Sequence, residues 1–441
     1  MSQDPKTYKD IYSKHLKEIN IVQDVYNGTT TAVGRIRKYP DESDTKYKER
    51  KEDAALNNFV FKTIDTIKNV IFRKDIDLEN IKNNDLLWYM DSIDLKNDID
   101  NFSKRVLSKR IRDGYTFIMV DSPQYDTELI RTKQDRQLAN IRPYLVSVDR
   151  KSVINWQGED IELAKWVVIS ETYTEQIGKF DEEIKEQYRV LYNDGTIEIY
   201  RESELYETFQ TGYKGLPLIK IGNDLTPPLL DHAKLNINHL NRNSELDNYI
   251  RVGGAPFIGV GGQMAGDDKQ PLTLGINSGM RFKDDNWKAE WIEMSGANAE
   301  MIENRIVKYE DAMLTFSIEL LTDDTIKTAT QVSKESAAKE SKLKHYSREL
   351  EEGINRAIEI MGDFQDGISG ENFIIVNKDF DSAILQPQEA AEIRADYLAG
   401  LISLDTVFDL YEKGERLPRR TDQEREAEKL LLRDSGIEWT S

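Results

Sequence analysis

Two stretches of helical periodicity between residues 296 and 364 constrain what this chain can fold into more than any other feature. In the first, apolar side chains recur at alternating spacings of three and four, which aligns them on one helix face. They are Ala299, Ile302, Ile306, Tyr309, Met313, Phe316 and Leu320. The second stretch repeats the pattern with Leu343, Tyr346, Leu350, Ile354, Ile358 and Met361. Such narrow seams favour packing against neighbouring helices over enclosure in a globular core. They indicate an assembly component and not an enzyme.

A polar segment, residues 322–328, separates the two helical stretches. On the first helix, the side away from the seam carries more carboxylates than basic groups. The carboxylates are Glu300, Glu303, Glu310, Asp311 and Glu319, against Arg305 and Lys308. Two other interpretations of the helices stay open: ordinary core helices of an α+β protein, or a coiled-coil dimer. Neither seam runs over enough heptads with charged flanks to require the dimer.

Composition excludes several classes of site. The 441 residues allow two or three domains. The chain has no cysteine, so disulfides and thiolate metal sites are excluded, and its four histidines have no zinc-site spacing. The net charge of −20 argues against gripping duplex DNA with the general surface, although DNA could still slide past. The chain has no apolar run of about 18 residues, so no membrane span is predicted. The polar N-terminus lacks a signal peptide's apolar core, so we expect synthesis in the cytoplasm.

Helices come first along the chain, and strands follow. Periodicity predicts helices over residues 5–24, 51–73 and 96–112, and a polar, mobile segment over 28–50. The predicted strands are 115–120, 143–148, 165–170, 188–192, 196–200 and 217–221, with a polar insertion over 122–141. Asn193-Asp194-Gly195 is a tight-hairpin signal. This part is therefore predicted to be α+β with a largely antiparallel sheet.

A small β module is predicted between two helices. A helix over 229–251 precedes it, and the helix of the first seam follows it. Its predicted strands are 256–260, 272–275, 280–282 and 289–293. A strand over 372–376 and helical pieces over 387–400, 403–413 and 421–434 complete the chain.

No motif predicts catalysis. Gly259, Gly261, Gly262 and Gly266 suggest a phosphate-binding loop, but turn residues follow them where that loop needs a helix. We interpret them as hairpin glycines. The carboxylate cluster at 181–183 and the pair Asp323-Asp324 are interpreted as solvated surface. The chain also has no G-x-S-x-G nucleophile elbow. We predict no enzymatic activity, no cofactor and no metal site.

Four features, in this order, resemble the portal proteins of tailed bacteriophages. The first two are the helix from Pro227-Pro228 through His239, and the module between that helix and Ala297-Asn298-Ala299. The third is Thr328-Ala329-Thr330-Gln331-Val332 at the start of the long helix. The fourth is residues 396–403 with the acidic segment 422–426. The alternatives are a nucleotide-binding enzyme with a helical interaction region, and another ring-forming head-tail adaptor.

The resemblance implies a homo-oligomeric ring, usually a dodecamer, at one capsid vertex of the virion, with assembly in the host cytoplasm. Double-stranded DNA would pass through its channel without sequence specificity. Terminase, a head-tail adaptor, and major capsid and scaffolding proteins would be its partners. The implied parts are an N-terminal arm (1–50), an α+β wing (51–226), a first stem helix (227–253), a clip (254–295), a second stem helix (296–321), a tunnel loop (322–328), the wing's long helix and strand (329–385) and a helical crown (386–441).

The resemblance also implies roles for individual residues. The tunnel loop at the constriction would be Thr322, Asp323, Asp324, Thr325, Ile326, Lys327 and Thr328. The channel-lining stem residues would be Glu300, Glu303, Lys308, Glu310 and Asp311, whose acidic surplus would repel the DNA backbone and keep it centred. Trp287 and Trp291 would contact partners of the clip, or form its own small core.

Overall fold

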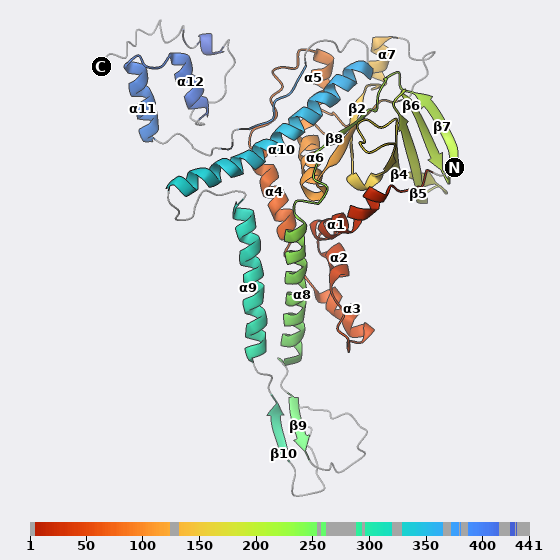
Figure 1. The fold of residues 1–441 in the computed structure, drawn as a ribbon, viewed down its shortest axis with the longest axis vertical. Coiled ribbons are helices and arrows are strands. Elements are labelled where there is room, and N and C mark those ends of the chain that lie inside the picture. The colour runs from red at the N-terminus through yellow and green to blue at the C-terminus, as the bar shows by residue number, and fades with distance from the viewer. Residues whose placement is uncertain are drawn as a thin grey trace. The chain divides into compact units, whose positions relative to one another are not determined.

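The fold is shown in Figure 1 as a computed structural model. The structure describes residues 5–123, 132–253, 257–261, 288–292, 296–319, 329–364, 372–378, 380, 387–413, 424–427 and 429. The chain divides into two compact units, Met1–Lys378 and Asp379–Ser441. Over the described ranges, no helix is both long enough and apolar enough to cross a membrane.

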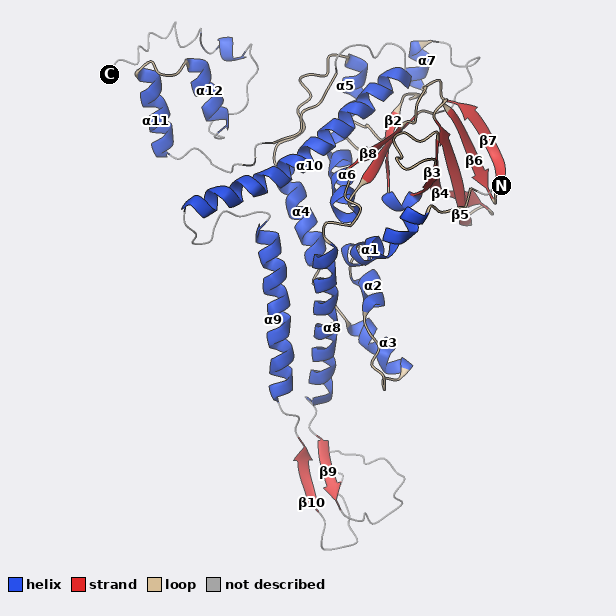
Figure 2. Ribbon diagram, viewed as in Figure 1, coloured by secondary structure: helices blue, strands red, loops and turns tan. Residues whose placement is uncertain are grey.

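Two antiparallel sheets of three and five strands, apart from a separate two-stranded pair between α8 (Leu230–Gly253) and α9 (Gly296–Glu319), form the β part of the first unit in the described ranges (Figure 2). The smaller has the order β2-β1-β8, from Tyr144–Val148, Thr116–Asp121 and Leu218–Ile221. The larger has the order β3-β4-β5-β6-β7, from Val153–Trp156, Trp166–Gln176, Glu182–Tyr192, Thr196–Arg201 and Glu204–Gln210. The predicted α+β class is therefore confirmed, and every pairing in these two sheets is antiparallel.

The smaller sheet is the middle layer of the unit. Phe117 and Met119 point from β1 into a core shared with the larger sheet, which includes Val167, Leu191 and Ile197. Side chains alternate along a strand, so the neighbouring residues of β1 face the opposite side. There β1 contacts α6 (Ile99–Asp113) and α10 (Ala329–Phe364). All six residues of β1 are consequently buried.

Helix α10 packs against this sheet as well as against other helices. The residues of its predicted seam from Leu350 onwards are buried against β1, β8, α4 and α6. Gly353 makes the approach possible, because a Cβ at this position would lie 2.7 Å from Ile221 Cδ1. The expectation that narrow seams favour neighbouring helices is thus met only in part by α10, because a sheet also offers an apolar face that accepts such a seam.

The described ranges of the first unit contain further helices. They are α1 (Asp10–Tyr26), α2 (Thr29–Ala32), η1 (Val33–Arg35), α3 (Asp44–Asp53), α4 (Phe59–Ile71), α5 (Asn84–Met90), α7 (Lys133–Leu138), α8 (Leu230–Gly253) and α9 (Gly296–Glu319). Strands β9 (Phe257–Gly261) and β10 (Lys288–Ile292) pair between α8 and α9. Asn58 caps α4 and Asp98 caps α6 by accepting backbone N–H groups, as expected at helix N-termini.

The second unit is helical where it is described. Helix α11 (Pro387–Leu398) contacts α12 (Leu404–Lys413), and residues 424–427 are helical. The Tyr411 hydroxyl donates to the Ala390 carbonyl over 3.1 Å. Ala390 and Phe408 are buried between the two helices. The predicted helices over 387–400 and 403–413 are confirmed.

Several predictions about local structure are wrong. Residues 28–50 form α2, η1 and most of α3, and they pack through the buried Ala32, Ile36 and Arg50. The first helix begins at Asp10, because the Lys9 N–H donates to the Ile154 carbonyl and keeps the preceding residues extended. The predicted strand at 372–376 is a single bridge between Asp77 and Ile375.

Asp94 is expected to make the first unit sensitive to acid. Burial alone would raise its pKa, but hydrogen bonds from Arg105, Asn97 and Lys96 outweigh burial and lower the pKa from 3.8 to about 2. The carboxylate therefore contributes stability above about pH 4, and this contribution of about 2 kcal/mol is lost as the pH falls through about 2. Urea titrations from pH 7 to pH 2 should show a weaker acid dependence for Asp94→Asn than for the parent. Asp91→Asn, an exposed control on the same loop, should match the parent; equal slopes for all three would contradict the assignment.

Candidate functional site

Helices α8 and α9 form a pair that carries most of the residues singled out from the sequence. In α9, Met313 is fully buried and Ile306 is nearly so, while Phe316 lies 5.0 Å from the His232 ring of α8, centroid to centroid. Ile302 and Tyr309 are half-buried on the same side. The predicted seam of α9 is therefore confirmed, and α8 is its main partner.

Polar contacts fix the register of the pair. His239 Nε2 of α8 lies 2.9 Å from Glu310 Oε1 of α9, and the His239 side chain is almost fully buried. Near the other end of the seam, Thr63 Oγ1 of α4 lies 2.6 Å from Ser317 Oγ and 3.3 Å from His232 Nε2. Burial lowers the pKa of His232, which keeps this ring neutral near pH 7. Because three helices meet at Thr63, α9 is held to α4 as well as to α8.

Asn236 attaches α8 to the segment before α4. Its Oδ1 accepts the Phe59 N–H over 3.0 Å, and its Nδ2 donates to the Asn57 carbonyl over 2.8 Å. The side chain is fully buried. A buried amide with both ends satisfied specifies one register, because any shift would leave polar groups unpaired.

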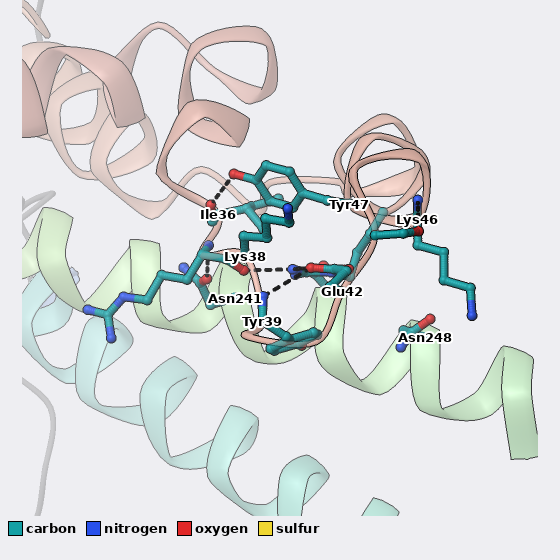
Figure 3. A network of polar contacts seen from close by, with 12 residues as sticks. Ile36, Lys38, Tyr39, Glu42, Lys46, Tyr47, Asn241 and Asn248 are labelled. Atoms are coloured by element: carbon teal, nitrogen blue, oxygen red, sulfur yellow. Dashed lines mark hydrogen bonds and ion pairs between the residues drawn. The ribbon is translucent and has the colours of Figure 1, made fainter.

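A second attachment surrounds Arg50 of α3, and Figure 3 shows its neighbours Tyr39 and Glu42 beside α8. Its guanidinium donates to both Glu42 oxygens over 2.8 and 2.7 Å, and to Ser244 Oγ of α8 over 3.1 Å. The hydrogen bonds from Arg50 lower the pKa of Glu42. The Arg50 guanidinium also lies 4.2 Å from the centroid of the Tyr39 ring. The segment that carries Glu42 and Arg50 thus packs against the side of α8. Its buried ion pair holds Arg50 in place to contact Ser244.

The structure separates one of the five predicted stem residues from the others. Glu300, Glu303, Lys308 and Asp311 are exposed on the side of α9 that faces away from the seam. Glu310 instead turns towards α8 and contacts His239, so its placement on the free face was wrong. The spacing in the sequence already indicates that Glu310 lies on the seam side, because position 310 follows Ile306 by four residues and precedes Met313 by three.

The exposed side of α9 has two unlike edges. Along one edge, Glu303 accompanies Val307 and Leu314, which are 51% and 45% exposed. Along the other, Met301, Arg305 and Lys308 line a groove of about 610 Å³ together with Arg242 of α8. Met301 is 66% exposed within that groove. Asp311 lies between the edges by helical spacing, whereas Glu300 also lines the groove.

Several predicted residues cannot be placed. Thr322, Asp323, Asp324, Thr325, Ile326, Lys327, Thr328, Trp287 and Leu320 lie outside the described residues, as do the predicted strands 272–275 and 280–282. Trp291 belongs to β10, where its backbone pairs with Ile258 of β9.

The described ranges contain no group of three or more His, Asp or Glu side chains placed to hold a metal ion. His232 contacts Thr63 and Phe316, and His239 contacts Glu310 and Asn243, in the interior of the helix packing. Sequence reasoning missed Arg50 and Thr63 as anchors of the helix pair. No local pattern marks either residue, because their partners are far away in the sequence.

Comparison with known proteins adds one family and two solved structures. Residues 228–365, which include α8 and α9, match the model of a family described as a domain of unknown function, DUF4055. No protein of the curated set matches the chain. A chain in the neck of an empty GTA particle is 11% identical with a TM-score of 0.40, covering 80% of this chain and 90% of its own. A chain in the virion of a native gene transfer agent (GTA) particle is 12% identical with a TM-score of 0.42, covering 88% and 98% respectively. The matched family has no stated activity, so it assigns none to this chain.

Proposed function

We propose that this chain is a portal protein, which forms a ring-shaped DNA channel at the unique vertex of a phage capsid. One observation carries the proposal. Helix α9 is braced to the body through α8 and α4, yet it exposes an acidic and apolar edge on one side and a basic groove on the other. Two rigidly held and complementary edges on one helix suit contact with two neighbouring copies.

Unlike edges favour a ring over a simple dimer. A two-fold dimer brings the same patch of both copies together, whereas a head-to-tail contact joins two different patches and closes into a ring when the rotation allows. In such a ring, Glu303, Val307 and Leu314 of one copy would meet Met301, Arg305 and Lys308 of the next. Burial of Val307, Leu314 and Met301 would supply apolar area, and the charges would set the direction.

The strip between the edges would then face the central channel. Asp311 gives this strip a negative charge and Glu300 adds to it at the border of the groove, which repels phosphate groups and keeps DNA from binding tightly to the wall. A channel that DNA must traverse in both directions needs such weak contact. We assign the narrowest point to residues 322–328, with Lys327 offering salt-sensitive contact to the DNA.

The remaining parts take their roles from this arrangement. The β9–β10 pair and the residues between its strands would meet the terminase during packaging and the head-tail adaptor afterwards. The α+β body and α10 would form the wing, in contact with major capsid and scaffolding proteins, and α11 and α12 would belong to the crown. ATP hydrolysis would be the terminase's task, and the ring, a dodecamer, would reside in the virion.

Electron microscopy and light scattering test the ring. Negatively stained protein should show rings with a central hole, and the mass should be a multiple of 51.0 kDa. The double substitution Arg305→Glu with Lys308→Glu should dissociate the rings, because it places carboxylates opposite Glu303. Adding Glu303→Lys to that variant should restore them. The exposed pair Lys14→Glu with Lys17→Glu makes the same change in net charge and should leave the rings intact.

A monomer or dimer at every concentration and salt would contradict the proposal. Rings that survive the reversal at positions 305 and 308 would remove α9 from the interface. Another ring-forming adaptor would also give rings, so the portal assignment further requires that the rings be incorporated into capsids before DNA enters. That order is visible when capsids are purified from a packaging-deficient infection.

A further inference from the structure

The hairpin of β4 and β5 extends beyond the sheet that supports its base. Strand β3 pairs with β4 only as far as Ile169, and β6 pairs with β5 only from Gln187 onwards. The outer halves, Thr172–Gln176 and Glu182–Glu186, pair only with each other. We call residues 172–186 the ribbon. A two-stranded ribbon is marginally stable in water by itself, so a partner surface would stabilise it.

The tip of the ribbon is apolar and exposed. The exposed fractions are 64% for Ile177, 87% for Phe180 and 73% for Ile184. Single exposed apolar residues are ordinary, but Phe180 at the end of a projecting ribbon, with Ile177 on one face and Ile184 on the other by strand alternation, marks a contact surface. Aromatic side chains such as Phe180 supply much of the binding energy where they fill a pocket.

The ribbon's charge restricts the partner's chemistry. Five carboxylates (Glu175, Asp181, Glu182, Glu183 and Glu186) against Lys179 and Lys185 leave a net charge of −3. Lys185 contacts Glu175 over 2.5 Å and Glu183 over 3.6 Å, and the Lys179 ammonium lies 5.4 Å from the centroid of the Phe180 ring, so Asp181 and Glu182 are the carboxylates near the tip that Lys185 does not pair with. The carboxylates next to Phe180 therefore favour a partner surface that offers an apolar hollow with basic groups at its rim.

The chain itself carries a hollow of this kind. A groove of about 550 Å³ lies between α2, η1 and α3, with an apolar lining that includes Val33, Tyr47 and Ala54. Lys48 and Lys51 stand at its rim, beside Glu52. The Lys48 ammonium lies 3.8 Å from Glu52 in a pair that is mostly exposed, and such pairs are weak. The floor continues into the buried cluster of Ala32, Ile36 and Leu240.

We propose that the ribbon tip of one copy docks into this groove of a second copy. Phe180 enters the hollow, Ile177 or Ile184 covers its mouth, and Asp181, Glu182 and Glu183 face Lys48 and Lys51. Phe180 is exposed and the groove open in the single chain, so the two surfaces do not satisfy each other within one copy. The contact joins unlike patches, as the α9 edges do, and is therefore compatible with a ring without depending on the channel function.

A photo-crosslinker at position 180 tests the contact directly in the full chain. Illumination should join position 180 to residues 47–54, and a mixture of light and heavy isotope-labelled protein should show the link between different copies. Crosslinks to the groove around Met301, to foreign proteins only, or within one copy would each overturn the proposal.

Assembly measurements give an independent test. Phe180→Ala should raise the concentration at half-assembly about thirtyfold, which corresponds to the loss of one interface hot spot. Leu163→Ala removes an exposed apolar side chain outside the ribbon and should leave the concentration at half-assembly unchanged. Lys48→Glu with Lys51→Glu should weaken assembly, and adding Glu182→Lys with Glu183→Lys in the same chain should restore it. If Phe180→Ala leaves assembly intact while the reversal at 305 and 308 disrupts it, the ribbon contact is wrong and the proposed ring stands.

Discussion

Replacing Arg110 with alanine is expected to lower the free energy of unfolding of the first unit by about 3–5 kcal/mol, because it leaves the largely buried Glu349 carboxylate with only the exposed His345 as a partner. Arg110 of α6 is 1% exposed. Its Nε donates to Glu349 of α10 over 2.8 Å, and its Nη1 donates to Asp224 over 2.7 Å. Burial alone would lower the pKa of Arg110, but these carboxylates outweigh burial and raise it. The side chain thus connects α6, α10 and the loop after β8.

The two carboxylates should contribute unequally. The Glu349 side chain is 14% exposed and the Asp224 side chain is 49% exposed, so water compensates the loss of Asp224 more fully. Urea denaturation should therefore rank the variants Arg110→Ala, Glu349→Ala and Asp224→Ala from most to least destabilised. Arg37→Ala, which removes an exposed arginine, should change stability by less than about 0.5 kcal/mol. A small effect at Arg110, similar to that at Arg37, would contradict the structural role given to it.

Truncation of Met313 to alanine is expected to cost about 2–5 kcal/mol, since it leaves a cavity in the seam between α8 and α9. Met313 is fully buried, whereas the next residue, Leu314, is 45% exposed. Leu314→Ala is therefore the matched control for stability and should cost less than about 0.5 kcal/mol in dissociated chains. Thermal unfolding followed by circular dichroism, in conditions that dissociate any oligomer, measures both. Equal losses for the two variants would mean that α9 is not packed through this face.

The parts of the fold that could be predicted from the sequence are those where one side of an element is buried. In α4, α6 and α9 the buried face requires apolar residues at helical spacing, and this periodicity can be recognised in the sequence. Strands β1 and β8 are short apolar runs for the same reason. Strand β7 was not predicted, because nearly all of its residues are exposed and only backbone pairing with β6 holds it.

The candidate site could be predicted less completely than the fold. Helical spacing placed Glu300, Glu303, Lys308 and Asp311 correctly on the exposed side of α9. It could not show that Arg305, Lys308 and Arg242 share one groove, because Arg242 comes from another helix. Long-range polar anchors such as Thr63 and Arg50 also leave no periodic signal, since each acts through one distant partner.

The bridge between Asp77 and Ile375 has a consequence for how the chain is made. Asp77 and Ile375 exchange both backbone hydrogen bonds, over 2.9 and 3.1 Å, and the Asn372 side chain accepts the N–H groups of Lys82 and Asn83. The loop between α4 and α5 therefore gains these hydrogen bonds only after a segment almost 300 residues further along the chain has left the ribosome. During translation this loop lacks its backbone partner, and contacts between such distant residues form slowly. A nascent chain arrested before residue 372 should consequently remain sensitive to protease near Asp77, because the bridge to Ile375 cannot yet form.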